Sequence, residues 1–278
     1  MRIQFVSPVQ NEEIFLPRLI NSLLHQSNKD WKLLIVDNAS TDSTLRIAKF
    51  WEKQDPRITT VTLKEKKENV FESWKEALRI CFEVTDCDYV QIVPGDDYLL
   101  NHDYVELALR SLSENSVNGL VPNFLYENRS VALDKISYQS LFKDWNYVHL
   151  IFGIYKTKDL YQASWRLSKL NGLGTTFDWW LSYFLIQYSP IYSPKTVFYR
   201  ESNPPRKTEV ILIAFRPILN HPVLKPIKRI YALRHPIRNH MKATSTDFKH
   251  YILVRGSIGI QDRFRLIVAF LSKIIRIY

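Results

Sequence analysis

Apolar residues follow two alternating patterns over the first hundred residues of this chain. Short apolar runs predict strands near residues 2–7, 32–37, 58–63 and 88–93. Apolar residues at helical spacing predict helices between these strands, near residues 12–26, 42–54 and 70–84. Strands that alternate with helices are typical of a mainly parallel sheet covered by helices. The pattern therefore predicts an α/β fold.

Beyond residue 100 the pattern is less regular and richer in aromatic residues. It predicts a helix over Tyr104–Leu112, a strand over Gly119–Phe124, a buried strand over Tyr147–Tyr155 and a helix over Phe177–Tyr188. The run 202–206 contains two prolines and predicts a linker, after which X-Pro pairs separate short helical pieces. A last helix is expected near 261–277, so the chain is expected to divide near residue 202.

Polar residues in front of the predicted helices indicate where those helices begin. Ser40-Thr41-Asp42 is expected to cap the second helix and Asn69 the third. Side chains of these types accept hydrogen bonds from the N–H groups of a first helical turn. Taken alone, Asp42 is therefore interpreted as a capping residue.

Two predicted strands run directly into carboxylates. Leu33–Val36 is followed by Asp37, and Tyr89–Val93 is followed by Pro94-Gly95-Asp96-Asp97. Ligands of open α/β sheets bind outside the carboxyl ends of the strands. Acidic residues there suit a hard cation that carries phosphates, or the hydroxyl and imide groups of a nucleotide. Such residues also form ordinary turns, but two acidic strand ends in one chain favour a binding site.

The composition excludes several classes of protein. Only 7 of the 278 residues are glycine, and neither a GxGxxG nor a GxxxxGK[ST] motif occurs, which disfavours dinucleotide-binding and P-loop proteins. The cysteines, Cys81 and Cys87, lack partners at metal-binding spacing, so we expect buried free thiols in a reducing cytoplasm. Residues 1–6 predict a strand rather than a secretory signal, and no apolar run is long enough to predict a membrane-spanning helix.

The net charge of +10 is concentrated at the carboxyl end of the chain. Residues 1–204 contain 23 Lys and Arg against 25 Asp and Glu, whereas residues 205–278 contain 15 against 3. This asymmetry indicates an interaction with a polyanionic surface, either a membrane or a nucleic acid.

Motifs in a fixed order resemble family 2 glycosyltransferases of the GT-A fold. They are Val6–Glu13 with Ser22–Ser27, Ile35–Thr44, Asn69 with Trp74–Leu78, Gly95-Asp96-Asp97, and Asp178 at the start of a Trp-rich helix. The resemblance covers about residues 1–202. It implies a nucleotide-diphospho-sugar transferase fold, a Rossmann-like mixed sheet flanked by helices, with a nucleotide-binding half (1–100) and an acceptor half (101–202). A basic, mainly helical extension (203–278) follows.

The resemblance also implies the reaction: transfer of a sugar, with inversion, from a nucleoside-diphosphate donor to a saccharide or lipid-linked saccharide in cell-surface polysaccharide synthesis. The implied nucleotide-binding residues are Pro8, Val9, Asn11, Glu12, Asp37, Lys75, Asp96 and Arg200. Asp37 would accept hydrogen bonds from the base. For Asn11 and Glu12 a helix N-cap with an acidic first turn is an alternative. Lys75 and Arg200 are alternatively surface residues.

The acidic motif implies a divalent cation, Mn²⁺ or Mg²⁺. Asp97 would be its ligand, and Asp96 would contact the ribose or the donor sugar. Such a cation takes carboxylate, phosphate and water oxygens and neutralises charge on the leaving diphosphate. The chain departs from the usual family pattern at Pro94, where an aspartate is common.

Asp178 is the implied general base, which removes the proton of the acceptor hydroxyl. Trp179 beside it is the candidate for stacking on an acceptor sugar. Helix capping by Asp178 is an alternative. Phe177 and Ser202 replace residues that the family often has. With Pro94, they keep open a second hypothesis, a catalytically impaired protein that binds nucleotide sugars or acts as a scaffold.

The carboxyl-terminal segment 263–278 is too short and too charged to span a membrane. Its apolar residues and interspersed Arg and Lys fit a helix that lies in the membrane interface. Anionic lipid would be attracted by a further polybasic surface, formed by Arg216, Lys225, Lys228, Arg229, Arg234 and Arg238. A helix packed on the catalytic domain is the alternative. Nucleic-acid binding is less favoured, because no recognisable motif for it is present. We therefore expect a cytoplasmic protein bound to the inner face of the cell membrane.

Overall fold

The structure is a computed structural model that describes residues 1–114, 117–126, 129–131, 147–168, 181–182, 184–185, 191–192 and 198–201. Its larger sheet has the strand order β10-β6-β9-β4-β1-β2-β3. The strands are β1 (Ile3–Val9), β2 (Trp31–Asp37), β3 (Ile58–Thr62), β4 (Tyr89–Ile92), β6 (Gly119–Leu120), β9 (Ile154–Lys156) and β10 (Ile191–Tyr192). β9 runs antiparallel to β4 and β6, whereas the other neighbouring pairs are parallel. The sheet is therefore mixed.

A smaller sheet has the order β5-β11-β7-β8. Its strands are β5 (Asp97–Leu99), β7 (Asn123–Tyr126), β8 (Arg129–Val131) and β11 (Phe198–Glu201). β11 runs antiparallel to β5 and parallel to β7. This sheet brings residues about a hundred positions apart in the sequence next to each other beside the carboxyl end of β4.

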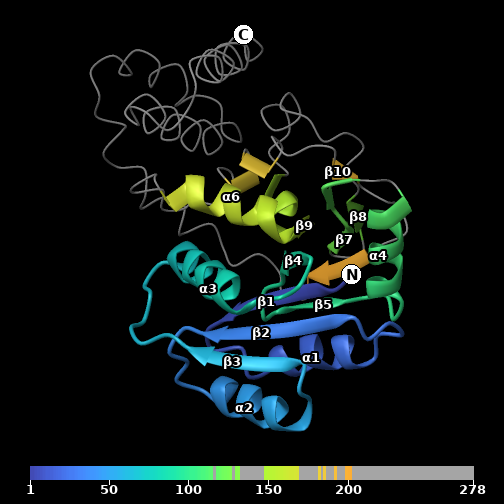
Figure 1. The fold of residues 1–278 in the computed structure, drawn as a ribbon. Coiled ribbons are helices and arrows are strands. Elements are labelled where there is room, and N and C mark those ends of the chain that lie inside the picture. Colours follow the sequence, from blue (N-terminus) through green and yellow to red (C-terminus); the bar gives the residue numbers. More distant parts are fainter. Residues whose placement is uncertain are drawn as a thin grey trace, which may run out of the picture.

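Helices cover both faces of the larger sheet. They are α1 (Leu16–Leu24), α2 (Thr44–Gln54), α3 (Val70–Val84), α4 (Tyr104–Glu114), the 3₁₀ helix η1 (Tyr147–Phe152) and α6 (Thr157–Ser168). α1 and α2 lie on one side of strands β1 to β3, and α3 and α6 lie on the other (Figure 1). The strands β1 and β2 between these layers are almost wholly buried. The predicted α/β fold is confirmed.

The contact face of α1 shows how the sequence specifies this packing. Its buried residues Leu16, Leu19, Ile20 and Leu23 recur at helical spacing. The predicted helix was longer, since α1 begins only at Leu16, with Pro17 in its first turn. A turn precedes it, in which the carbonyl of Glu12 accepts the N–H groups of Phe15 and Leu16 at 3.0 and 2.8 Å.

The third helix follows its local signals closely. α3 covers the predicted range 70–84, and the Asn69 side chain accepts the Phe71 N–H at 2.8 Å. The predicted cap of the second helix is displaced. The N-cap position of α2 is Ser43, without a side-chain cap, while the Asp42 carboxylate accepts the N–H of Thr44 at 2.9 Å.

Two predicted strands are confirmed only in part. The range Tyr147–Tyr155 forms η1 and then β9, because the N–H of Gly153 folds back to the Leu150 carbonyl at 3.1 Å. An apolar run of this length does not by itself distinguish helix from strand. The range Gly119–Phe124 is divided between two sheets, β6 and β7, and Pro122 between them has no N–H to donate to a ladder.

The remaining predictions are tested only in part. Residues 181–182 and 184–185 are helical, as expected for 177–188, while the linker at 202–206 and the helix at 261–277 lie outside the described residues. Cys81 and Cys87 are buried free thiols, as expected, and burial raises the pKa of Cys81 to about 12. Within the described ranges, no helix combines the length and apolar character that a membrane crossing needs.

The packing of α1 gives the first prediction. Leu19→Ala should lower the free energy of unfolding by about 2–5 kcal/mol, because it leaves a cavity between α1 and the sheet. Urea denaturation followed by tryptophan fluorescence measures this loss. Ile14, which is 67% exposed, provides the control, and Ile14→Ala should change stability by less than about 0.5 kcal/mol. Equal losses in both variants would contradict this placement of α1.

Candidate active site

The carboxyl ends of β1 and β2 lie side by side. Val9, the last residue of β1, is the register partner of Asp37, the last residue of β2. The N–H of Asn38 donates to the Val9 carbonyl at 2.8 Å and continues this pairing by one step. The loops that follow the two strands therefore leave the sheet from the same place, where α/β proteins bind ligands.

Asn11 ties these two loops together. Its carboxamide oxygen accepts the Thr41 N–H at 2.8 Å, and its own N–H donates to the Ser40 hydroxyl at 3.0 Å. Asn11 has a φ of 57°, a left-handed conformation that asparagine tolerates better than most residues. The alternative in which Asn11 caps the first helix is wrong, because the N-cap position of α1 is Phe15.

Further hydrogen bonds connect the same loops. The Thr44 hydroxyl accepts the Glu12 N–H at 2.7 Å, and the Asp42 carboxylate accepts the Glu13 N–H at 3.2 Å. The Glu13 carboxylate in turn accepts the Ser43 N–H at 2.9 Å. Burial acts to raise the pKa of Asp42, but its hydrogen bonds from Thr44 and Glu13 outweigh burial and hold the pKa below its usual value. Glu12 is buried and precedes α1, so the acidic first turn expected there is not formed.

Asp37 is buried at the centre of this edge, with a side chain that is 0% exposed. Among the described residues, its carboxylate receives hydrogen bonds only from the Ser40 N–H, which is 3.4 and 3.3 Å from the two oxygens. An ionised carboxylate can accept about four hydrogen bonds, and burial without them is costly. Asp37 therefore keeps acceptor capacity that a ligand donor can use.

Asp96 and Asp97 lie beside the loop that follows β1. A Cβ atom added to Gly95 would lie 2.7 Å from Val9 Cγ1 and 3.1 Å from Glu12 Cγ, so the backbone at Gly95 packs directly on that loop. Asp97 is 2% exposed and begins β5. Val9 thus has Asp37 on one side and the Gly95-Asp96-Asp97 turn on the other. The structure brings the two predicted carboxylate groups to one edge.

The fit of a divalent cation depends on the donors at this edge. Nowhere in the part of the chain that the structure describes do three or more His, Cys, Asp or Glu side chains form a group that could hold a metal. Mg²⁺ and related cations at nucleotide sites need only one or two carboxylates, with phosphate and water oxygens completing the shell. The adjacent carboxylates of Asp96 and Asp97 fit that requirement.

The structure describes some of the other predicted site residues but not all of them. Pro8 is buried in β1 next to Val9. Lys75 lies on α3 and pairs with Glu72 at 3.5 Å. Arg200 lies opposite Tyr98 in the register of β11 and β5, one position from the pair formed by Glu201 and Asp97. Asp178 and Trp179 lie outside the described residues, so their roles stay predictions.

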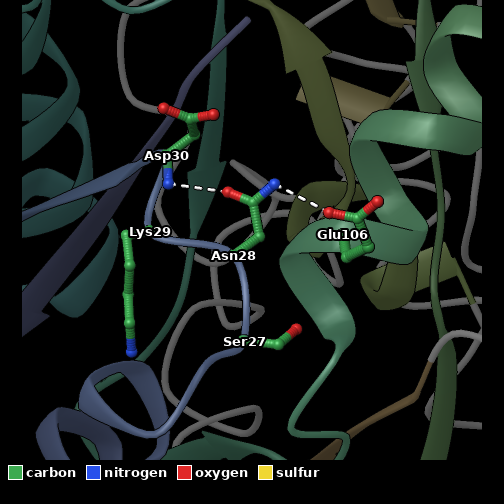
Figure 2. Close-up of a pocket in the computed structure, with 5 residues that line it drawn as sticks. All are labelled: Ser27, Asn28, Lys29, Asp30 and Glu106. Atoms are coloured by element: carbon green, nitrogen blue, oxygen red, sulfur yellow. Dashed lines mark hydrogen bonds between the residues drawn. The ribbon is translucent and has the colours of Figure 1, made fainter.

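A separate pocket of about 600 Å³ lies at the opposite end of β2. Ser27, Asn28, Lys29, Asp30 and Glu106 line it (Figure 2). Its polar groups bond largely to one another or to the backbone: Asn28 donates to Glu106 at 2.8 Å, and Lys29 donates to the Leu24 and Gln26 carbonyls at 3.0 and 2.6 Å. Because these contacts serve the end of α1, we assign the active site to the carboxyl edge.

Asn38, which has no individual role predicted from the sequence, is 1% exposed and donates a hydrogen bond to the loop after β3. The available signal was its position, since a polar residue directly after a buried apolar strand must find hydrogen-bond partners.

This mixed sheet, with carboxylates at the edge where open α/β sheets bind ligands, defines an α/β ligand-binding fold. Residues 5–175 match the model of the family described as "Glycosyl transferase family 2". This match covers more than half of the chain, so the chain belongs to glycosyl transferase family 2.

Named relatives agree with this assignment. EpsE of Bacillus subtilis (strain 168), provisionally named a glycosyltransferase, is 34% identical over 97 residues, which are 34% of this chain and 33% of EpsE. Poly(ribitol-phosphate) beta-glucosyltransferase of Bacillus spizizenii (strain ATCC 23059 / NRRL B-14472 / W23) is 27% identical over 101 residues, 36% of this chain and 15% of that protein. The chain thus spans a third or less of the length of either relative.

Solved structures share the fold. S. aureus TarS 1-349 in complex with UDP-GlcNAc has a TM-score of 0.59 at 18% identity, over 97% of this chain and 79% of TarS 1-349. The mannosyltransferase PcManGT from Pyrobaculum calidifontis, in complex with GDP-Man and Mn2+, has a TM-score of 0.51 at 16% identity, over 100% of this chain and 81% of that chain. At these identities the likeness establishes the fold alone.

The close approach of Gly95 gives a prediction. Gly95→Ala should lower the free energy of unfolding by about 1–3 kcal/mol, because the new methyl group overlaps Val9. Thermal or urea denaturation measures the change. In the double variant Val9→Ala/Gly95→Ala the overlapping atom is gone, so the loss should be smaller than the sum of the two single losses. Additive losses would contradict the contact.

Proposed function

We propose that this chain transfers a sugar, with inversion, from a nucleoside-diphosphate donor to a saccharide or lipid-linked saccharide acceptor of cell-surface polysaccharide synthesis. The observation that carries the proposal is Asp37, a buried carboxylate with unused acceptor capacity, at the same sheet edge as Asp96 and Asp97. Membership of glycosyl transferase family 2 supports it.

In this proposal Asp37 accepts a hydrogen bond from the N–H group of the base. This hydrogen bond would recover part of the cost of burying a carboxylate that accepts only long hydrogen bonds from the described residues. Pro8, Val9, Asn11 and Glu12 form the adjoining wall, and the cross-links from Asn11 to Ser40 and Thr41 keep that wall rigid. UDP-GlcNAc and GDP-Man in the two solved neighbours are consistent with a donor of this class.

Asp97 is proposed as the ligand of Mn²⁺ or Mg²⁺, and Asp96 as the contact to the ribose or donor sugar. The cation, when bound, neutralises charge on the departing nucleoside diphosphate. Lys75 and Arg200 add positive charge toward the nucleotide and its phosphates. Mn2+ in the PcManGT complex is consistent with this requirement.

The catalytic step needs a base on the acceptor side. We propose that Asp178 takes the proton of the acceptor hydroxyl while the hydroxyl oxygen bonds to the anomeric carbon. The bond from that carbon to the phosphate oxygen breaks on the opposite face, and the nucleoside diphosphate leaves with its electron pair. Trp179 would stack on the acceptor sugar.

The division of the chain follows the same proposal. Residues 1–100 bind the nucleotide, 101–202 bind the acceptor, and 203–278 attach the enzyme to the cytoplasmic face of an anionic membrane. Fifteen Lys and Arg against three Asp and Glu in residues 205–278 support this attachment. A membrane-attached enzyme would meet a lipid-linked acceptor at the membrane surface.

Carboxylate substitutions test the catalytic proposal. Asp97→Asn and Asp178→Asn should each lower the rate of transfer from a nucleotide sugar in the presence of Mn²⁺ by about a hundredfold or more. The release of nucleoside diphosphate measures this rate, with and without a chelator. Asp30→Asn changes the residue just before β2, at the opposite end from Asp37, and should leave the rate unchanged.

Two results would contradict parts of this proposal. Normal turnover in both variants would show that the catalytic residues are assigned wrongly. Binding of nucleotide sugar by the wild type without transfer or hydrolysis would favour the catalytically impaired protein suggested by Pro94, Phe177 and Ser202.

Vesicle binding tests the attachment. The double variant Lys228→Gln/Arg229→Gln should weaken sedimentation with phosphatidylserine-containing vesicles about thirtyfold, because each basic residue near such a surface contributes about 1 kcal/mol. Lys49→Gln/Lys53→Gln removes two charges from α2 and should have little effect. Salt-sensitive retention on RNA, with none on the vesicles, would contradict a membrane role.

A further inference from the structure

We propose that Asn38 is a positioning residue: it holds the loop 63–69 in place as a wall of the nucleotide site. This inference rests on the proposed function. It assigns a role to a side chain that acts through the loop that it holds.

The carboxamide of Asn38 pairs with the backbone of Lys67 through both of its polar atoms. The side-chain nitrogen donates to the Lys67 carbonyl at 2.8 Å, and the side-chain oxygen accepts the Lys67 N–H at 2.7 Å. The nitrogen also donates to the Gln10 side-chain oxygen at 3.1 Å. Asn38 is 1% exposed. Its two bonds to the Lys67 backbone resemble the paired N–H and C=O bonds between neighbouring strands, although Lys67 itself is not in a strand.

Separate hydrogen bonds hold the two ends of this loop. At its start, the Leu63 N–H donates to the Asp37 carbonyl at 2.9 Å. At its end, Asn69 caps α3 through the Phe71 N–H at 2.8 Å. Asn38 thus provides the central anchor of the loop, and the residue beside it in the chain is Asp37, the proposed contact to the base.

The loop has positively charged side chains that would attract an anionic ligand. It contains Lys64, Lys66 and Lys67, with Glu65 and Glu68 between and after them. The Arg79 hydrogen bond lowers the pKa of Glu76 against the effect of burial, and the charges of Arg79, Lys67 and Lys75 lower it further. Lys67 therefore lies within electrostatic reach of Glu76, as does Lys75, one of the proposed nucleotide contacts. Release of the loop would move this charge.

A second buried amide provides a matched control. Gln26 is also 1% exposed and also makes three hydrogen bonds, to the Ser22 and Asn101 carbonyls at 2.9 and 2.8 Å and from the Val105 N–H at 3.1 Å. It lies just after α1, by the pocket at the amino end of β2, away from the carboxyl edge. Its loss should cost comparable stability without disturbing the nucleotide site.

The experiment compares Asn38→Ala, Asn38→Asp and Gln26→Ala in the full chain. UDP and GDP, each with Mn²⁺, are titrated by calorimetry, and hydrogen exchange reports the Lys67 amide. Asn38→Ala should weaken binding of the preferred diphosphate about tenfold, the equivalent of one or two lost hydrogen bonds. The Lys67 amide should exchange faster, and KM for the donor should rise more than kcat falls.

The two other variants separate positioning from general destabilisation. Gln26→Ala should lower the melting temperature about as much as Asn38→Ala, yet bind the diphosphate within about twofold of wild type. Asn38→Asp keeps the acceptor for the Lys67 N–H but places a second acceptor against the Lys67 carbonyl, so it should also weaken diphosphate binding. If Asn38→Ala does not fold, Asn38→Asp takes its place, and a diphosphate affinity equal to that of Gln26→Ala overturns the role.

The diphosphate affinities of the variants and of the wild type test the positioning role separately from the proposed function. Equal diphosphate affinity in Asn38→Ala and Gln26→Ala, with wild-type binding intact, overturns the positioning role and leaves the proposed function standing. Failure of the wild type to bind either diphosphate overturns both.

Discussion

The parallel register of β1 and β2 is the constraint on which the rest of the site depends. Val9 lies opposite Asp37, and the bond from the Asn38 N–H to the Val9 carbonyl continues the pairing at 2.8 Å. Side chains alternate between the faces of a sheet, so a shift of one residue would turn Asp37 to the opposite face. The register therefore determines both the position of the carboxylate and the point at which the two loops meet.

Buried polar side chains serve two different purposes in this fold. Gln91 lies in β4, where its side-chain nitrogen donates to the Tyr104 hydroxyl and the Phe152 carbonyl, both at 2.8 Å. Such a side chain is satisfied and holds the core together. Asp37 is as deeply buried, but from the described part of the chain its carboxylate receives only long hydrogen bonds from one N–H. The contrast separates a structural amide from a carboxylate suited to a ligand.

Local signals predicted the regular parts of the fold well. α3 has the predicted bounds because its cap at Asn69 and its apolar stripe are contained in one short segment. The acidic strand ends likewise follow directly from apolar runs that stop at Asp37 and before Asp96. Within the predicted strand 147–155, residues 147–152 form a 3₁₀ helix and only 154–155 belong to a strand, since an apolar run is compatible with either structure until its neighbours are known.

The amino-acid sequence alone therefore established the order of strands and helices over residues 1–93, the acidic strand ends and the resemblance that the family match confirmed. The tertiary structure decided which residues meet. Asn11 with Thr41, Asn38 with Lys67 and Gly95 with Val9 are contacts between segments about thirty or more residues apart. No local pattern encodes such pairs, because the topology of the parallel sheet brings them together. Asn38 was therefore only a polar residue after a strand until the fold placed Lys67 against it.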